Sequence, residues 1–285
     1  LTLSNVTVAN NTASTGSLGS SGGGMSLQAV GNSPLNVEMT NVTVQGNTGG
    51  NDFSSSGGGM AIDLNGGQAT LRQTRILGNH AAKIKTMLGG PSQGGGIYLV
   101  DGNLQLENVL IAGNDGERGE ALWVESGNLV NVIVGMNYVT IADNYRTAPD
   151  AGAAVHAGGA KTLFTLDNTL ISGSPTAFEA QNNGQPSTLT VHNVLIDNNV
   201  GTVSSGTITV NGTPLRGTAG YVDAGAGDYH LTAASGAVDK GNGLPPAVDL
   251  DGSVRPQGAT TDIGAYEFSP LGTTDKKVYL PMLAR

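Results

Sequence analysis

The sequence predicts an all-β protein: a parallel β-helix, which is a solenoid with three sheets, followed by a non-repeating C-terminal cap. Three observations lead to this fold class. A motif of alternating apolar residues closed by Asn or its equivalent recurs seven times, a Gly-led motif lies between its copies, and no segment shows a convincing 3.6-residue periodicity. Each strand would therefore pair in parallel with its copies in the repeats above and below.

The first motif supplies two short strands to each repeat. Its copies are LTLSNVTVANN (1–11), VEMTNVTVQGN (37–47), TLRQTRILGN (70–79), LQLENVLIAGN (104–114), MNYVTIADN (136–144), LFTLDNTLISGS (163–174) and LTVHNVLIDNN (189–199). The closing positions lie 25 to 36 residues apart, so a constant structural rung carries loops of different length.

The Gly-led motif supplies the remaining strand, which is the first of the three in each repeat and would form the first sheet. Its copies are GGGMSLQ (22–28), GGGMAID (57–63), GGGIYLV (94–100), GEALWVE (119–125), GAAVHAG (152–158) and, more weakly, TAFEAQ (176–181). A propeller blade needs four strands and a leucine-rich repeat has a different spacing, so a coil of three parallel strands fits best.

Equivalent positions form aliphatic columns that we expect to point inward. One column is Val6, Val42, Thr74, Val109, Val139, Thr169 and Val194; another is Val8, Val44, Ile76, Ile111, Ile141, Ile171 and Ile196; a third is Met25, Met60, Ile97, Leu122, Val155 and Phe178. Asparagine recurs at the bend between the second and third strands, as Asn5, Asn41, Asn108, Asn168 and Asn193. Asparagine tolerates the left-handed conformation and can bond its neighbours along a ladder.

Composition excludes several function classes. The net charge is −9 with 13 scattered Lys and Arg residues, which disfavours a nucleic-acid partner. The chain has no cysteine and no apolar run of 18 residues, so we expect neither disulfides nor a membrane span. Because Leu1 already belongs to a repeat, we expect a processed or truncated chain.

Over roughly residues 1–210 the repeats resemble the right-handed parallel β-helix proteins of the pectate-lyase-like superfamily, and this likeness implies a right-handed coil. The segments 228–242 and 249–268 resemble the C-terminal region of bacterial secreted β-helix proteins of the choice-of-anchor Q type. The residues that carry this likeness are Asp249, Asp251, Gly252, Arg255, Pro256, Asp262, Ile263, Gly264, Ala265 and Glu267. The resemblance implies a secreted or cell-surface location. We expect coils over 1–215, a C-terminal cap over 216–270 and a terminal tail over 271–285.

The acidic residues of the cap have two interpretations. Asp249, Asp251 and Asp262 would join Arg255 and Glu267 in a polar network that fixes the cap. Alternatively, the three aspartates would bind Ca²⁺, because clustered carboxylates beside a Gly-enabled turn suit a hard cation.

The outer face of the first sheet is the candidate glycan-binding surface. Tyr98, Trp123 and His156 would lie on successive rungs as an aromatic strip, with Asp63 and Glu125 beside it to accept bonds from sugar hydroxyls. The alternative is that these rings only stack on one another or pack under a loop. The loop 80–93, with Lys83 and Lys85, would be either a basic wall or a solvated insertion.

Catalysis has no recognisable signature. A polysaccharide lyase would need an Arg or Lys base, for which Arg118, Lys83 and Lys85 are candidates, and a cation held by Asp63 and Glu125. A glycosidase would need two carboxylates, and these two lie two rungs apart, about 9.6 Å along the solenoid.

Three functions remain open. The sequence favours a secreted or cell-surface structural, adhesive or glycan-binding β-helix without catalysis. The alternatives are a polysaccharide lyase or glycoside hydrolase that uses the first-sheet face, and a subunit that self-associates into filaments.

Overall fold

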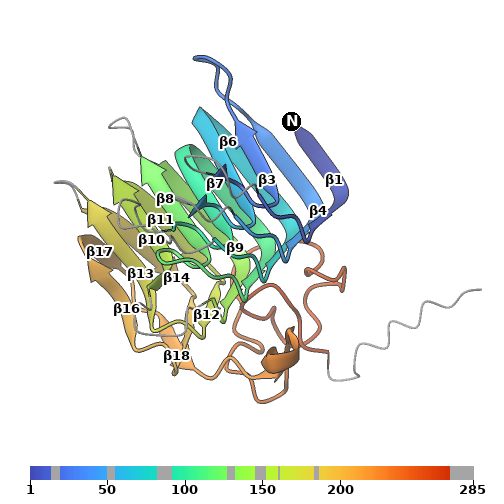
Figure 1. The fold of residues 1–285 in the computed structure, drawn as a ribbon. Helices are drawn as coiled ribbons and strands as arrows, with labels where there is room; N and C mark the ends of the chain where they lie inside the picture. Colours follow the sequence, from blue (N-terminus) through green and yellow to red (C-terminus); the bar gives the residue numbers. More distant parts are fainter. Residues whose placement is uncertain are drawn as a thin grey trace, which may run out of the picture.

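The fold is nearly all-β and solenoid-like. The computed structural model describes residues 1–13, 20–49, 55–81, 92–126, 132–144, 152–159, 161–182 and 186–269. Parallel strands from successive repeats run side by side, and the C-terminal segment lies against one side of them (Figure 1). The single helical element among the described residues is a short 3-10 turn, η1 (Ala224–Ala226), and no helix of the described chain is long and apolar enough to cross a membrane.

The strands form three columns, each made of equivalent pieces of successive repeats. The first column contains β3 (Met25–Gln28), the first parts of β6 (Met60–Leu77) and β7 (Ile97–Ala112), then β8 (Leu122–Ser126), β10 (Ala153–Gly159), β13 (Thr176–Asn182) and β16 (Thr202–Gly206). The second contains the first parts of β1 (Thr2–Ala9) and β4 (Val37–Gln45), the middle of β6 and β7, then β9 (Val132–Ala142), β11 (Thr162–Asp167), β14 (Ser187–His192) and β17 (Ile208–Asn211). The third contains the ends of β1, β4, β6, β7 and β9, then β12 (Leu170–Ser172), β15 (Leu195–Asp197) and β18 (Leu215–Gly217).

Two smaller pairings complete the sheet structure. The parallel pair β2 (Ser20–Ser21) and β5 (Ser55–Ser56) lies outside the three columns. The antiparallel pair β19 (Tyr221–Asp223) and β20 (Asp228–Leu231) belongs to the C-terminal segment. All pairings in the three columns are parallel, as the repeat predicted.

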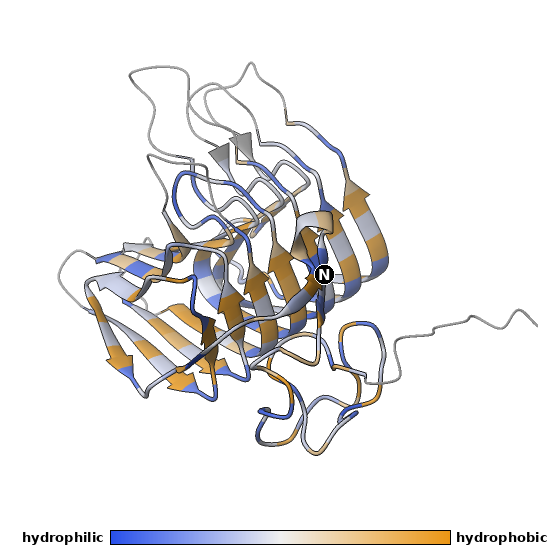
Figure 2. Ribbon diagram, turned by 90° about the horizontal axis from the view of Figure 1, so that it is seen from below, coloured by the Kyte–Doolittle hydropathy of each residue, from blue (hydrophilic) through white to orange (hydrophobic). Residues whose placement is uncertain are grey.

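The predicted inward columns form the core. Hydrophobic positions recur at matching places in neighbouring strands (Figure 2), and buried members include Val44, Ile76, Ile111, Ile141, Ile171 and Ile196. Thr74 and Thr169 occupy the valine column and are also buried; their hydroxyls donate to the carbonyls of Arg72 and Asp167. A threonine is tolerated there because its hydroxyl finds a backbone acceptor two residues earlier.

The predicted asparagine bend is confirmed. All five asparagines have positive φ, from 46° at Asn168 to 57° at Asn193, and Gln73 and Tyr138 take the same conformation in the two repeats without asparagine. The side chains bond along the column in places: Asn41 Nδ2 donates to Asn5 Oδ1 at 2.7 Å.

A second ladder runs through the closing asparagines and is fully buried. Asn47 Nδ2 donates to Asn79 Oδ1, Asn79 Nδ2 to Asn114 Oδ1, and Asn114 Nδ2 to Asn144 Oδ1, at 2.8–2.9 Å. Each of these oxygens also accepts the backbone N–H of the preceding asparagine. The ladder satisfies polar groups at a turn that would otherwise leave buried donors unpaired.

The C-terminal end of the solenoid is closed by a change of residue type. Arg216 stands opposite Ile196 in the isoleucine column, and its guanidinium donates to the carbonyls of Asp197 and Val200. Ser204 stands opposite Phe178 in the first column. A charged and a small polar residue thus replace the large apolar ones where the stack ends.

The C-terminal segment lies against the side of the coils, and its assignment as a cap stays a prediction. It packs on the outward side of the third column, where Leu110 and Ala142 meet Leu250 and Tyr266, and Leu195 meets Leu231. Several outward positions of this column are apolar, among them Leu110, Leu170 and Leu195, and the C-terminal segment covers them. The boundaries at 215 and 270 stay predictions, and the tail 271–285 lies outside the described residues.

Candidate functional site

The outer face of the first column carries the residues predicted to bind glycans. Strand pairing places Ala61 beside Tyr98, Tyr98 beside Trp123, and Trp123 beside His156. Asp63 and Glu125 lie two residues further along, separated in the register by Val100. The predicted positions are thus neighbours on one face, but their accessibility differs.

Trp123 and His156 do not form an exposed strip. Their rings stack with centroids 4.0 Å apart and planes 4° apart, yet Trp123 is only 3% exposed and His156 is 0% exposed. The indole Nε1 donates to Glu125 Oε2 at 2.8 Å, and His156 Nδ1 lies 3.3 Å from Glu179 Oε2. These two rings pack on each other, as the alternative interpretation had it, and offer no free face to a sugar.

The indole ring of Trp123 lies close against the backbone of Gly158 in the next coil. A Cβ added to Gly158 would lie 2.8 Å from Cζ2 of Trp123, so only glycine leaves room for the ring there. Burial lowers the pKa of His156 to about 4, against the opposing effect of Glu179. The imidazole is therefore neutral at pH 7 and is poorly suited to donate a proton.

Tyr98 and Asp63 share a hollow in this face. The hollow has a volume of about 150 Å³, and its lining consists of Gln28, Ala61, Ile62, Asp63, Tyr98 and Val100. It forms because the residue beside Tyr98 in the preceding coil is Ala61, and the one before that is Ser26. Small side chains leave space where the next two coils carry rings.

The electrostatic surroundings of this hollow are acidic. The pKa of Tyr98 is raised to about 12, first by burial and then by the carboxylates of Glu125, Asp63 and Asp101, while Ser56 bonds its hydroxyl. Asp63 is half-buried, and its Oδ1 accepts the backbone N–H of Asn65 at 3.2 Å. The hollow therefore combines an aromatic ring, an amide and a carboxylate.

Glu120 is a buried carboxyl that the sequence did not single out. It is 0% exposed, its Oε1 accepts the N–H of Gly152 at 2.9 Å, and its Oε2 has no hydrogen-bond partner. Burial raises its pKa to about 8, so the carboxyl is largely protonated at pH 7. The available signal was the motif itself, because glutamate replaces the second glycine of GGGM in GEALW.

The candidate catalytic groups do not assemble. Arg118 Nη1 donates to Gln181 Oε1 at 3.2 Å, Glu125 is held by Trp123, and Asp63 lies two coils from Glu125. Lys83 and Lys85 lie outside the described residues. Within the described part of the first-sheet face, no pair of carboxylates stands ready for acid–base chemistry.

The carboxylates of the three aspartates predicted to bind Ca²⁺ each have their own hydrogen-bond or ion-pair partners. Asp249 accepts the backbone N–H groups of Ser253 and Glu267, at 2.8 and 3.0 Å. Asp262 accepts those of Asp239 and Phe268, and Asp251 pairs with Arg75 and His230. No group of three His, Asp or Glu residues in the described ranges is arranged to hold a metal ion. Backbone amides and cations already bond to these carboxylate oxygens, and the Ca²⁺ assignment stays a prediction.

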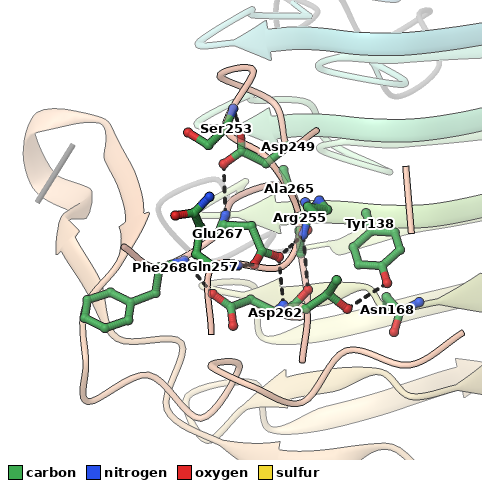
Figure 3. A network of polar contacts seen from close by, with 12 residues as sticks. Tyr138, Asn168, Asp249, Ser253, Arg255, Gln257, Asp262, Ala265, Glu267 and Phe268 are labelled. Atoms are coloured by element: carbon green, nitrogen blue, oxygen red, sulfur yellow. Dashed lines mark hydrogen bonds and ion pairs between the residues drawn. The ribbon is translucent and has the colours of Figure 1, made fainter. Parts of the chain in front are cut away.

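The polar network of the C-terminal segment is centred on a buried ion pair (Figure 3). Arg255 Nη1 donates to Glu267 Oε1 at 2.5 Å, and both side chains are fully buried. Nη2 of Arg255 donates to Asn108 Oδ1, and the guanidinium lies 4.4 Å above the ring centre of Tyr138. The network thus attaches the C-terminal segment to the bend column of the coils.

We compared the chain with protein-family models, with curated proteins and with solved structures, and none of the three comparisons finds a match.

Proposed function

We propose that this chain is a right-handed parallel β-helix of the pectate-lyase-like type with a choice-of-anchor Q-like C-terminal segment. Its function is structural or adhesive, outside the cell or at the cell surface, and it binds glycans without cleaving them. The parallel three-column arrangement and the ladders support the β-helix. The location rests on the resemblance of residues 228–268 alone.

The observation that carries glycan binding is the hollow beside Tyr98. Sugar rings are recognised by an aromatic face together with a few polar groups that accept and donate to hydroxyls. Tyr98, Asp63 and Gln28 meet this description.

Isothermal titration with a panel of oligosaccharides tests binding. Tyr98→Ala and Ala61→Leu, which fills the hollow, should each abolish it. Trp123→Phe is the matched control, because it keeps a ring against His156 and lies outside the lining. Equal binding by Ala61→Leu and the parent chain would contradict a site in the hollow.

Polysaccharide cleavage on the same face is the second candidate, and Glu120 is the observation in its favour. A carboxyl that stays protonated at pH 7 can act as a general acid. Its free oxygen is buried, however, and no second carboxylate in the described residues is paired with it. New absorbance from unsaturated sugars, or reducing ends released from polysaccharides with and without Ca²⁺, lost in Glu120→Gln, would establish catalysis in place of simple binding.

The filament alternative receives less support. Arg216 places a charge in the apolar column at the C-terminal end of the stack. Head-to-tail stacking would have to bury that charge, which is costly without a partner.

A further inference from the structure

We infer that the hollow beside Tyr98 selects glycans that carry a protonated amino group. This inference rests on the proposed glycan binding and names the class of ligand. Among the described residues, its lining offers an aromatic ring, a carboxylate and an amide, and includes no lysine or arginine. The ligand group that complements such a lining is a cation attached to a sugar ring.

The first argument is the sign of the field in the hollow. The charges of Glu125, Asp63 and Asp101 all act on the Tyr98 hydroxyl in the same direction, opposing its ionisation. A field that opposes a negative charge stabilises a positive one at the same place. A partly enclosed site is screened less by salt than an open surface, so the effect persists in solution.

The second argument is that Asp63 has unused acceptor capacity. Its Oδ1 accepts one backbone N–H at 3.2 Å, whereas an ionised carboxylate can accept about four hydrogen bonds. An ammonium group donates three, and a charge-assisted bond is roughly twice as strong as a neutral one. Asp63 therefore gains more from an amine than from a sugar hydroxyl.

The third argument is the aromatic ring itself. Tyr98 is a neutral phenol at pH 7, as tyrosine ordinarily is, and an electron-rich ring attracts an ammonium near its face. Ala61 does not fill the space beside the ring. The same hollow is unfavourable for a uronic acid, because the ligand carboxylate would face Asp63 and the described lining residues include no compensating cation.

The probes are three oligosaccharides of equal length: a β-1,4-linked glucosamine hexasaccharide, its N-acetylated form, and a galacturonate hexasaccharide. Titration of the whole chain near about pH 6, where a sugar amine is protonated, should show the glucosamine form binding at least about tenfold more tightly than the acetylated one. The galacturonate form should bind least. Affinity for the glucosamine form should fall as salt is added.

Asp63→Asn is the decisive variant, because it removes the charge and keeps the shape. It should weaken binding of the glucosamine form by about tenfold and leave the acetylated form nearly unchanged. Glu38→Gln is the matched control, since Glu38 is an exposed carboxylate on β4 in the second column. It changes the net charge equally but lies outside the hollow.

Two outcomes would overturn the inference while leaving glycan binding intact. One is equal affinity for the acetylated and the amine-bearing hexasaccharide, with both lost in Ala61→Leu. The other is a glucosamine affinity that Asp63→Asn and Glu38→Gln reduce alike, which would indicate attraction by net charge alone. Absence of binding to every oligosaccharide would refute the proposed function itself.

Discussion

The repeated coils and the C-terminal segment solve the same problem with different chemistry. In the coils, a ladder of buried neutral amides bonds from one coil to the next, as Asn79 does with Asn114. In the C-terminal segment, buried carboxylates accept individual backbone N–H groups, as Asp249 and Asp262 do. A buried arginine then balances the charge.

The difference follows from periodicity. A repeating chain places an identical donor and acceptor one rung apart, so a ladder of uncharged side chains satisfies both without desolvating an ion. The segment from 218 to 268 has no repeat, and its backbone donors need acceptors from irregular positions. Carboxylates supply several acceptor sites each, at the cost of burying charge. We therefore expect that removing one buried polar side chain destabilises the coils less than it destabilises the C-terminal segment.

The largest expected effect is on the buried ion pair. Arg255→Met should lower the free energy that holds the C-terminal segment in place by about 3–5 kcal/mol, because Glu267 is left buried without its cation. Arg75→Met removes a cation from the partly exposed pair with Asp251 and should cost much less. Denaturant unfolding of both variants measures the contrast, and equal losses would refute the special role of burial.

A pH titration of stability tests the fully buried carboxyl of Glu120 in the coils. Burial raises the pKa of Glu120 from its ordinary 4.5 to about 8, so the unfolded chain ionises first and the fold loses stability between these values. The expected loss is on the order of 3 kcal/mol over that range. Glu120→Gln should remove this slope and become more stable than the parent above pH 8, whereas Glu38→Gln should follow the parent curve.

Removing one side chain from the buried asparagine ladder should have an effect on stability of intermediate size. Asn114→Ala should lower the free energy of unfolding by about 1–3 kcal/mol, because the N–H and amide of Asn79 lose their buried acceptor. Asn41→Gly removes the exposed bond to Asn5 but keeps the left-handed φ of 53°. It should change stability by less than about 0.5 kcal/mol. Similar losses from both variants would show that burial does not distinguish the two asparagine columns.

The smallest expected effect concerns His230 at the surface of the C-terminal segment. Its bond to Asp251, helped by Asp228 against partial burial, raises its pKa to about 9. Its contribution to stability is complete below about pH 6.5, the ordinary pKa of histidine, and is lost as the pH rises through 9. The melting temperature of His230→Gln should approach that of the parent chain above pH 9; a constant difference would argue against this titration.

The register between strands of successive repeats was predictable, because stacking makes residues at equivalent motif positions neighbours in space. Ile76, Ile111 and Ile141 lie in one buried column, and the bend asparagines share one left-handed conformation. The exposure of Trp123 was not predictable in the same way. An outward position in a strand is buried or exposed according to what packs over it. The alternation of apolar and polar residues in the sequence does not show what packs there.

In the candidate site, too, the sequence predicted which residues are neighbours but did not predict what surrounds them. Tyr98 and Asp63 were found from register alone, and the hollow between them depends on the small Ala61 one coil away. The partners of Asp249, Asp251 and Asp262 depend on irregular turns, which present backbone donors to the carboxylates of Asp249 and Asp262. Spacing in the chain carries no information about such irregular turns.

The sequence by itself determined the parallel coils, their inward columns and the bends, because a periodic pattern repeats its local geometry at every rung. Only the tertiary structure decided that residues 218–268 lie on the side of the third column, that Arg255 pairs with Glu267, and that Trp123 is covered. The physical reason is the sequence distance between contacting residues. In the coils, a periodic sequence brings equivalent residues of neighbouring repeats into contact. A non-repeating segment instead packs on apolar surface and bonds to polar groups that lie far away in the chain, and no sequence pattern marks these partners.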